Sequence, residues 1–279
     1  MPGTLTCGAL RLALDAPRVM GVVNVTPDSF SDGGRLANAA LAHARKLLDD
    51  GAHLLDIGGE STRPGAAAVS EQAELERVLP LLEALRPECD QRNVPISVDT
   101  RKPAVMRAAI AAGAGMINDV EALRASGAID AIAGATSPVA VCLMHMKGEP
   151  ATMQQFVDYD DVVAEVVLFL RERIDACRSA RIAADRLVVD PGFGFGKTVH
   201  HNLALLRRLE QIVALGYPVL AGLSRKATIG VITGRAVDDR VAGSVAAALA
   251  AVARGASIVR VHDVRETVDA LKVWQAVND

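Results

Sequence analysis

Residues 21–34 read GVVNVTPDSFSDGG, in which an apolar, β-branched run stops at Asn24 and a polar segment with Pro and Gly follows. Such an apolar run is typical of a strand that is buried on both faces, as in a parallel sheet. Polar segments after buried strands run over the surface, where binding residues are often placed. This stretch therefore predicts a parallel strand that leads into a ligand-binding loop.

The same order of features recurs along the chain: a short apolar run, a polar residue at its end and an Ala/Leu-rich helical pattern. We expect strands at residues 19–23, 54–57, 96–98, 116–117, 139–143, 187–189, 219–221 and 258–261. We expect helices at residues 39–50, 72–85, 104–112, 162–176, 202–215, 241–254 and 265–277. The strand ends lie on average about 34 residues apart, which is the length of one strand plus one helix.

Eight such units favour an α/β fold in which residues 1–279 form a single (β/α)8 TIM barrel, with a short N-terminal hairpin within residues 4–14. A doubly wound sheet would gather its ligand contacts near one switch point, whereas here a polar residue follows every strand. The carboxyl ends of all barrel strands open onto one face, so these residues should converge there. They are Asn24, Asp56, Asp99, Asn118, His145, Asp190, Ser224 and Arg260.

Composition narrows the possible classes of protein. The chain is 51% hydrophobic with a net charge of −3, which gives no general field for nucleic acid or an anionic membrane. Its four cysteines form no C-x-x-C pair, so we expect reduced thiols and neither a disulfide framework nor a zinc site. No signal-peptide pattern opens the sequence, and no uncharged run reaches the roughly 18 residues of a membrane helix. We expect a cytoplasmic protein without nucleic-acid or membrane partners.

Residues 188–198, VVDPGFGFGKT, contain the Gly-Lys-Thr of a phosphate-binding loop. That loop also needs a glycine five residues before Gly196, where this chain has Pro191. The alternating glycines instead favour a backbone that passes close to a flat ligand, with Phe193 or Phe195 as a wall. We therefore do not expect a nucleotide loop here.

Basic residues gather after the last two expected strands. GLSRKATIG, residues 222–230, supplies Arg225 and Lys226, and IVRVHDVRET, residues 258–267, supplies Arg260 and His262. Loops after the seventh and eighth strands are the usual phosphate site of this fold. An Asn or Asp at a strand end also suits a helix cap, but a cap does not call for Lys or Arg. We expect a local anion site within the barrel mouth.

Eight motifs in this order resemble the dihydropteroate synthase family over residues 19–273: MGVVNVTPDSFSDGG, DIGGESTRPG, ISVDT, INDV, CLMHM, DPGFGFGKT, GLSRK and RVHDV. The resemblance implies a (β/α)8 barrel that joins 6-hydroxymethyl-7,8-dihydropterin diphosphate to p-aminobenzoate and releases pyrophosphate. It further implies Mg²⁺ as a helper ion, a homodimer and a sulfonamide target.

The resemblance also assigns residues to the pterin ring, whose N3–H and 2-amino group donate hydrogen bonds and call for carboxylate and amide acceptors. Asp99, Asn118 and Asp190 would line that donor edge. Lys226 would reach the pterin oxygen and a ring nitrogen, and Arg260 would lie along the ring near the phosphates. The rest of the implied ring pocket is Met144, Phe195 and Gly222.

For the diphosphate, the resemblance implies contacts with Asn24, Arg63, Arg260 and His262, and a Mg²⁺ ion held by the Asn24 amide oxygen. Loops 25–36 and 61–67 would close over the first substrate and build the p-aminobenzoate site, excluding water. We expect C–O cleavage to precede attack by the weakly nucleophilic arylamine. The p-aminobenzoate contacts would be Phe30, Thr62, Arg63 and Pro64. The catalytic residues would be Asp99, Asp190, Lys226, Asp32 and Arg63.

Two departures from the family pattern leave alternatives open. Ala227 replaces a serine that many members use for the p-aminobenzoate carboxylate, and residues 120–123, VEAL, replace a Ser/Gly-rich stretch. A pterin-binding protein or regulator without synthase activity is therefore one alternative. A corrinoid-type methyltransferase with the same pterin edge is a second. A phosphate-sugar isomerase, with Glu60 as base and His145 as neutral partner, is a third.

Overall fold

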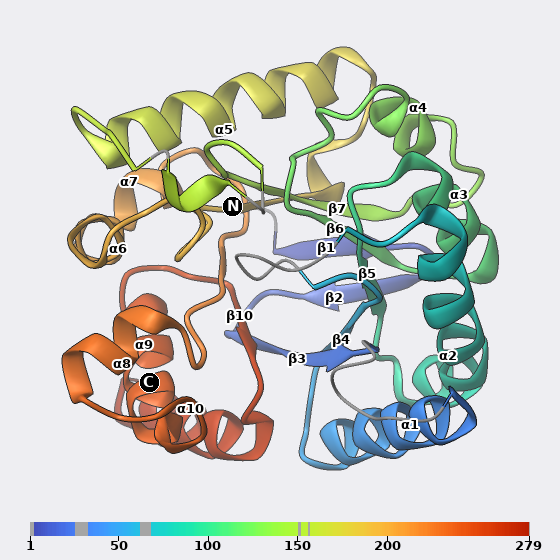
Figure 1. The fold of residues 1–279 in the computed structure, drawn as a ribbon, viewed down its shortest axis with the longest axis horizontal. Helices are drawn as coiled ribbons and strands as arrows, with labels where there is room; N and C mark the ends of the chain where they lie inside the picture. The colour runs from blue at the N-terminus through green and yellow to red at the C-terminus, as the bar shows by residue number, and fades with distance from the viewer. Residues whose placement is uncertain (1–2, 26–32, 62–67, 150–151, 156, 279) are drawn as a thin grey trace.

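A computed structural model of the protein describes residues 3–25, 33–61, 68–149, 152–155 and 157–278. Within these residues, two antiparallel strands precede eight parallel strands. Figure 1 shows the helices as an outer ring around the strands, and the ring follows chain order from blue through green to red. The predicted (β/α)8 barrel with an N-terminal hairpin is confirmed.

Each parallel strand lies beside its chain neighbour, because the sheet order is β8-β7-β6-β5-β4-β3-β10-β9. A parallel bridge between Val189 and Val219 closes the ring between β8 and β9. The hairpin strands are β1 (Thr4–Cys7) and β2 (Leu10–Ala13). The barrel strands are β3 (Arg18–Asn24), β4 (Leu54–Gly58), β5 (Ile96–Asp99), β6 (Met116–Asp119), β7 (Ala140–Met144), β8 (Leu187–Asp190), β9 (Leu220–Ala221) and β10 (Ile258–Val261).

The helices cover the outer face of these strands, and none in the described part of the chain is long and apolar enough to cross a membrane. They are α1 (Gly33–Asp49), α2 (Glu71–Arg92), α3 (Pro103–Ala112), α4 (Ala128–Ala133), α5 (Val162–Ser179), α6 (Val199–Arg207), α7 (Glu210–Val213), α8 (Ala227–Thr233), α9 (Val241–Val252) and α10 (Val264–Asn278). Short 3₁₀ turns are η2 (Met153–Gln155), η3 (Ala184–Arg186) and η4 (Val237–Asp239).

Two expected helices are too short, since α1 begins at Gly33 and α2 continues to Arg92, and a third is interrupted. The pattern predicts a single helix over residues 202–215, but α6 ends at Arg207 and α7 begins at Glu210. Arg208 lies between them with φ −112°, and its guanidinium donates to both carboxylate oxygens of Asp161 at 3.2 and 3.0 Å. Asp161 also caps α5. This tertiary contact accompanies the break, which no local pattern could reveal.

The hairpin closes the amino-terminal end of the barrel. Leu5, Cys7 and Leu12 are buried in one cluster with barrel residues that include Met20 and Leu54. A methyl group at Gly115, just before β6, would lie 2.9 Å from the Cys7 carbonyl oxygen, so the hairpin approaches the barrel backbone directly. Ligands must therefore enter from the opposite, carboxyl end.

The inner face of the barrel changes character along each strand. Successive side chains alternate between faces, so residues two apart point the same way. Leu54, Met116, Val188 and Ile258 are fully buried in the cluster with the hairpin. We call this apolar layer the floor. The residues two positions later are Asp56, Asn118, Asp190 and Arg260.

Candidate active site

Polar side chains from several strands meet directly above the floor. Arg260 lies between two carboxylates: its Nε donates to Asp56 Oδ2 at 2.6 Å and its Nη2 donates to Asp99 Oδ2 at 2.9 Å. Asn118 Nδ2 donates to the same Asp56 oxygen at 3.0 Å. With Asp190, these residues form what we call the mouth layer. The predicted convergence of β4, β5, β6 and β10 residues is therefore confirmed.

Burial perturbs the charges of this layer. It raises the pKa of the Asp99 carboxyl to about 7, although the Arg260 guanidinium opposes the shift. Burial alone would lower the pKa of Arg260, but the Asp56 and Asp99 carboxylates outweigh it and hold that pKa above its ordinary value. Arg260 therefore stays cationic, while Asp99 titrates near neutral pH.

Asp190 and Lys226 form the second charged pair of the mouth. Burial raises the pKa of Asp190, although the Lys226 ammonium and the N–H of Gly192, which donates to Asp190 Oδ1 at 2.7 Å, oppose it. Burial lowers the pKa of Lys226 to about 8, against the attraction of Asp190. The ammonium donates to the Phe193 carbonyl and lies 4.5 Å from the centroid of the Phe195 ring. This lysine is thus held over an aromatic face at the edge of the layer.

The glycine-rich loop of residues 191–198 lies against Lys226 and an apolar cluster of the barrel. Gly194 has φ +81°, and a methyl group there would lie 3.1 Å from Lys226 Cδ, so glycine admits the lysine stem. Phe195 packs against an apolar cluster containing Met144, whereas Phe193 is fully buried in the main core. Of the two candidate aromatic walls, the geometry leaves Phe195. At Gly222, a methyl group would lie 4.0 Å from Lys226 Nζ and from Arg260 Cβ.

The Gly-Lys-Thr lysine has a role inside this loop that the sequence does not reveal. Lys197 is buried, and its ammonium lies 3.0 Å from the Gly192 carbonyl oxygen, 2.9 Å from that of Phe195 and 2.9 Å from His145 Nδ1. Burial and this neighbouring cation lower the pKa of His145 to about 2. Lys197 therefore fixes the loop conformation that presents Phe195.

His145 does not join the mouth layer, contrary to the convergence expected of all strand-end residues. It lies one position beyond Met144, the end of β7, and its ring packs edge-on against Phe169 at 4.9 Å between centroids. Glu60 is likewise engaged, because Lys102 Nζ donates to it at 2.6 Å. Burial raises the pKa of Glu60, but the hydrogen bonds from Lys102 and Val69 outweigh it. Both side chains are engaged by other protein groups, so neither is available to act as the base of an isomerase or as its neutral partner.

The expected phosphate contacts in the described part of the chain are Arg260, His262 and Asn24, which lie on the neighbouring strands β10 and β3 or directly after them. His262 follows β10 two residues after Arg260; its N–H donates to Ser224 Oγ at 3.2 Å, and its Nδ1 lies 3.1 Å from that oxygen. Asn24 ends β3 in register with Gly58, and its side chain is exposed. Five predicted site residues lie outside the described part of the chain: Phe30, Asp32, Thr62, Arg63 and Pro64.

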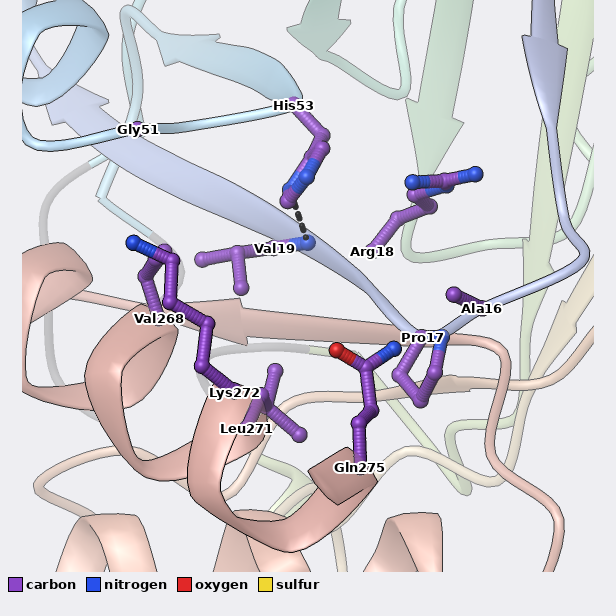
Figure 2. A pocket seen from close by; sticks show the side chains of 10 residues that line it. All are labelled: Ala16, Pro17, Arg18, Val19, Gly51, His53, Val268, Leu271, Lys272 and Gln275. Atoms are coloured by element: carbon purple, nitrogen blue, oxygen red, sulfur yellow. Dashed lines mark hydrogen bonds between the residues drawn. The ribbon is translucent and has the colours of Figure 1, made fainter. Parts of the chain in front are cut away.

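A separate cavity of about 350 Å³ lies at the other end of the barrel (Figure 2). It is bounded by the start of β3 at Arg18 and Val19, by His53 before β4, and by the last turns of α10, including Lys272 and Gln275. None of the predicted site residues lines it. The mouth and this cavity are therefore different places in the molecule.

Comparison with known proteins decides the family. The model of the pterin binding enzyme family matches residues 20–262. The dihydropteroate synthase of Neisseria meningitidis serogroup B is 53% identical over 278 residues, covering 97% of this chain and 96% of that protein. That of Escherichia coli K12 is 49% identical, covering 95% and 93%. The chain belongs to the dihydropteroate synthase family.

Solved structures of dihydropteroate synthases agree with this assignment. The Xanthomonas albilineans enzyme with 4-aminobenzoic acid superposes with a TM-score of 0.92 at 58% identity, covering 100% of this chain and 99% of that one. The Yersinia pestis enzyme in a sulfonamide drug complex gives 0.92 at 48% identity, covering 99% of both chains. The barrel of this dihydropteroate synthase family member is thus shared over its whole length.

The loop after β6, where this chain departs from the family pattern, is well supported without glycine. Ala122 and Leu123 both have positive φ, 54° and 58°, which is unfavourable for side chains with a Cβ. Asp119 compensates by accepting from the N–H groups of Glu121 at 2.8 Å and Leu123 at 2.7 Å. Arg173 of α5 donates to the Ala122 carbonyl at 2.8 Å. The Asp119 and Arg173 side chains therefore hold this loop of the dihydropteroate synthase family member.

The second departure, Ala227, stands at the first position of α8, directly after Lys226. Lys226 is the N-cap residue of this helix, with φ −67° and ψ 158°, and makes no side-chain capping hydrogen bond. Ala227 is exposed. The ammonium of Lys226 is held by the Phe193 carbonyl and lies over the Phe195 ring, and the side chain at position 227 takes no part in these contacts.

Proposed function

We propose that this chain is a dihydropteroate synthase that condenses 6-hydroxymethyl-7,8-dihydropterin diphosphate with p-aminobenzoate and releases pyrophosphate. The observation that carries the proposal is the mouth layer, in which acceptors from β5, β6 and β8 face a barrel opening flanked by Lys226 and Arg260. A pterin ring presents a donor edge and an acceptor oxygen, and this set of groups complements both. Curated relatives that are about half identical over nearly their full length support the same reaction.

In the proposed mechanism, the ring binds first and loses pyrophosphate before the second substrate attacks. The bond between the pterin methylene carbon and the diphosphate oxygen breaks, and its electron pair leaves with pyrophosphate. The Arg260 guanidinium would stabilise that negative charge, and its hydrogen bonds to Asp56 and Asp99, which keep it oriented, support this role. The Asp99 and Asp190 carboxylates stabilise the positive charge left on the ring and methylene. The arylamine nitrogen then attacks the methylene and loses a proton.

We propose Mg²⁺ as the helper ion, with Asn24 as its protein ligand. No group of three or more His, Cys, Asp or Glu that could hold a metal occurs in the described residues. One exposed amide oxygen at the end of β3 nevertheless suits Mg²⁺, which keeps several waters and is commonly bound through substrate phosphates. When bound, the ion would neutralise charge on the departing pyrophosphate.

We propose that the second substrate binds through Phe30, Thr62, Arg63 and Pro64, with Asp32 near the diphosphate. A solved relative supports such a site, since the Xanthomonas albilineans enzyme was captured with 4-aminobenzoic acid. These five positions lie outside the described residues, so their assignment stays a prediction from the sequence.

We further propose a homodimer in the cytoplasm. Exposed apolar side chains gather on the later helices, with Val231 and Ile232 on α8 and Val273 and Val277 on α10 at 59–78% exposure. Exposed apolar groups of this kind favour a protein contact when they form a patch. All four cysteines are free thiols, as in proteins of a reducing compartment.

The deciding experiment measures pyrophosphate release from the pterin diphosphate with Mg²⁺, with and without p-aminobenzoate. We expect release that depends on p-aminobenzoate and disappears in Lys226→Ala. Lys46→Ala is the matched control, since Lys46 is an exposed lysine of α1 paired with Asp50, and it should keep full activity. Tight pterin binding without release in the unaltered protein would overturn the proposal and leave a binding protein or regulator.

A further inference from the structure

Asp56 is the one carboxylate of the mouth layer to which the reaction assigns no substrate contact. Its side chain is fully buried inside β4, with Gly58 still to follow before the strand ends. One of its oxygens, Oδ2, accepts two hydrogen bonds, from Asn118 Nδ2 at 3.0 Å and from Arg260 Nε at 2.6 Å. A buried carboxylate is unfavourable unless its contacts compensate for lost hydration, so these two contacts need an explanation.

Neutralising Arg260 does not explain Asp56, because Asp99 already accepts from the same guanidinium at 2.9 Å. In the described part of the chain, Asp56 Oδ1 is also buried without a hydrogen-bond partner. Leaving a buried polar atom unpaired costs about 1–3 kcal/mol. The contact that distinguishes Asp56 from Asp99 is the one to Asn118.

That contact determines which way the Asn118 amide points. Asn118 is nearly fully buried, and its NH₂ group is turned toward Asp56 Oδ2. The reversed amide would place its carbonyl oxygen against a carboxylate oxygen, and two acceptors repel each other. Asn118 Oδ1 is therefore turned away from Asp56 and acts as an acceptor for other groups.

We propose that Asp56 is a positioning residue that fixes Asn118 as a hydrogen-bond acceptor and thereby sets the selectivity of the mouth for a 2-amino pteridine. This inference rests on the proposed pterin-binding function. A pterin carries an amino group at C2, which donates, whereas lumazine, the 2-oxo pteridine, carries an accepting oxygen at C2 and a hydrogen on N1. Without Asp56, the Asn118 amide is free to turn and donate to that oxygen. The discrimination between the two rings should then shrink.

The test compares the dissociation constants of pterin and lumazine for the intact protein and for Asp56→Leu, which has a similar size but offers no acceptor to Asn118. We expect the unaltered protein to prefer pterin by about 100-fold or more, because a site built for a donor leaves buried acceptors unpaired when the donor is missing. Asp56→Leu should narrow that preference at least about ten-fold, mainly through weaker pterin binding. An Asp56→Leu protein that is folded and keeps the original preference would overturn the proposal.

A second substitution separates loss at Asn118 from loss at Arg260. A carboxylate at position 118 accepts in either orientation, so Asp56→Leu with Asn118→Asp should recover the preference for pterin that Asp56→Leu alone loses. No recovery would show that the loss arose elsewhere, and would also overturn the proposal. Should Asp56→Leu fail to fold, Asp56→Ser, which leaves room for water, is compared in the same way.

Ser97→Ala is the matched control. Ser97 is buried and lies opposite Asp56 in the register of β4 and β5, and its hydroxyl has no partner in the described residues. Ser97→Ala should leave the ratio of the two dissociation constants unchanged, and a Ser97→Ala effect as large as that of Asp56→Leu would overturn the specific role of Asp56. Failure of the unaltered protein to bind either ring would instead refute the proposed function.

Discussion

The floor and the mouth layer lie two residues apart on the same strands, yet they use opposite chemistry. Leu54 and Met116 are buried in the floor against the hairpin, whereas Asp56 and Asn118 form the mouth layer above them. The floor contributes stability through buried apolar area. The mouth layer contains buried charged groups. Their burial lowers the stability of the fold but strengthens their electrostatic interaction with a bound ligand. One barrel interior thus separates folding from chemistry by depth alone.

The largest effect should come from removing a mouth charge. Lys226→Met keeps the length of the side chain but removes the ammonium that we propose contacts the pterin oxygen. We expect kcat/KM to fall on the order of 10³-fold, since removing one preorganised electrostatic contact typically has such an effect. Thermal unfolding should change little, because the substitution also removes a buried charge. A comparable loss of stability would contradict the separation between mouth and floor.

The opposite result is expected at the floor. Leu54→Ala removes a fully buried side chain from the cluster with the hairpin and should lower the free energy of unfolding by about 3 kcal/mol. Denaturation in urea measures this. Leu168→Ala, at a position 56% exposed on α5, should change stability by less than about 0.5 kcal/mol. The KM for the pterin substrate should stay unchanged in both variants.

The cost of the mouth should appear as a dependence of stability on pH. Burial raises the pKa of Asp99 to about 7, above its value in the unfolded chain, so the folded state binds the proton more tightly. This contribution favours folding at low pH and is lost as pH rises toward 7. Asp99→Asn should therefore gain stability relative to the unaltered protein between pH 5 and pH 8, by roughly 2 kcal/mol. A constant difference between the two unfolding free energies would show that Arg260 fully offsets burial.

The smallest effect lies away from both layers. Arg181 is exposed, follows α5 and has φ +64°, a conformation that favours glycine. Arg181→Gly should raise the free energy of unfolding by about 1 kcal/mol and leave activity unchanged. Arg181→Ala keeps the unfavourable Cβ and should bring no gain. Equal unfolding free energies of the two variants would mean that the positive φ of Arg181 does not destabilise the protein.

Most of the architecture follows from local pattern. The strands appear as continuous apolar runs because parallel strands are covered on both faces, and a polar residue marks the end of each run. The eight strands and their order could therefore be predicted. The break near Arg208 could not, because it accompanies a contact with Asp161, far away in the chain. Phe193 and Phe195 looked equivalent in sequence, and only packing distinguishes the core residue from the wall.

The candidate site was predicted less completely than the barrel. Asp56 and Asp99 both follow apolar runs, but β4 continues two residues beyond Asp56, which therefore lies deeper and contacts Asn118. The alternation of side chains along the strand could have indicated that Asp56 points into the barrel, since Asp56 shares a face with Leu54 and Gly58. The role of Lys197 could not be predicted, although Gly-Lys-Thr resembles part of a phosphate-binding loop. Its partners include backbone carbonyl groups, which no sequence pattern reveals.

The short pairing between β8 and the β9 segment has a consequence for local opening of the barrel. Strand β9 spans only Leu220–Ala221, and β8 meets it through the single bridge of Val189 with Val219. This seam has few cross-strand hydrogen bonds, so its amides should exchange with solvent deuterium before those of the long β3–β4 ladder. Asp190 ends one side of the seam, and Lys226 follows the other. A pterin ring bound between Asp190 and Lys226 would contact both sides of this seam and stabilise it. The rate of amide hydrogen exchange at Val189 should therefore fall when the ligand binds.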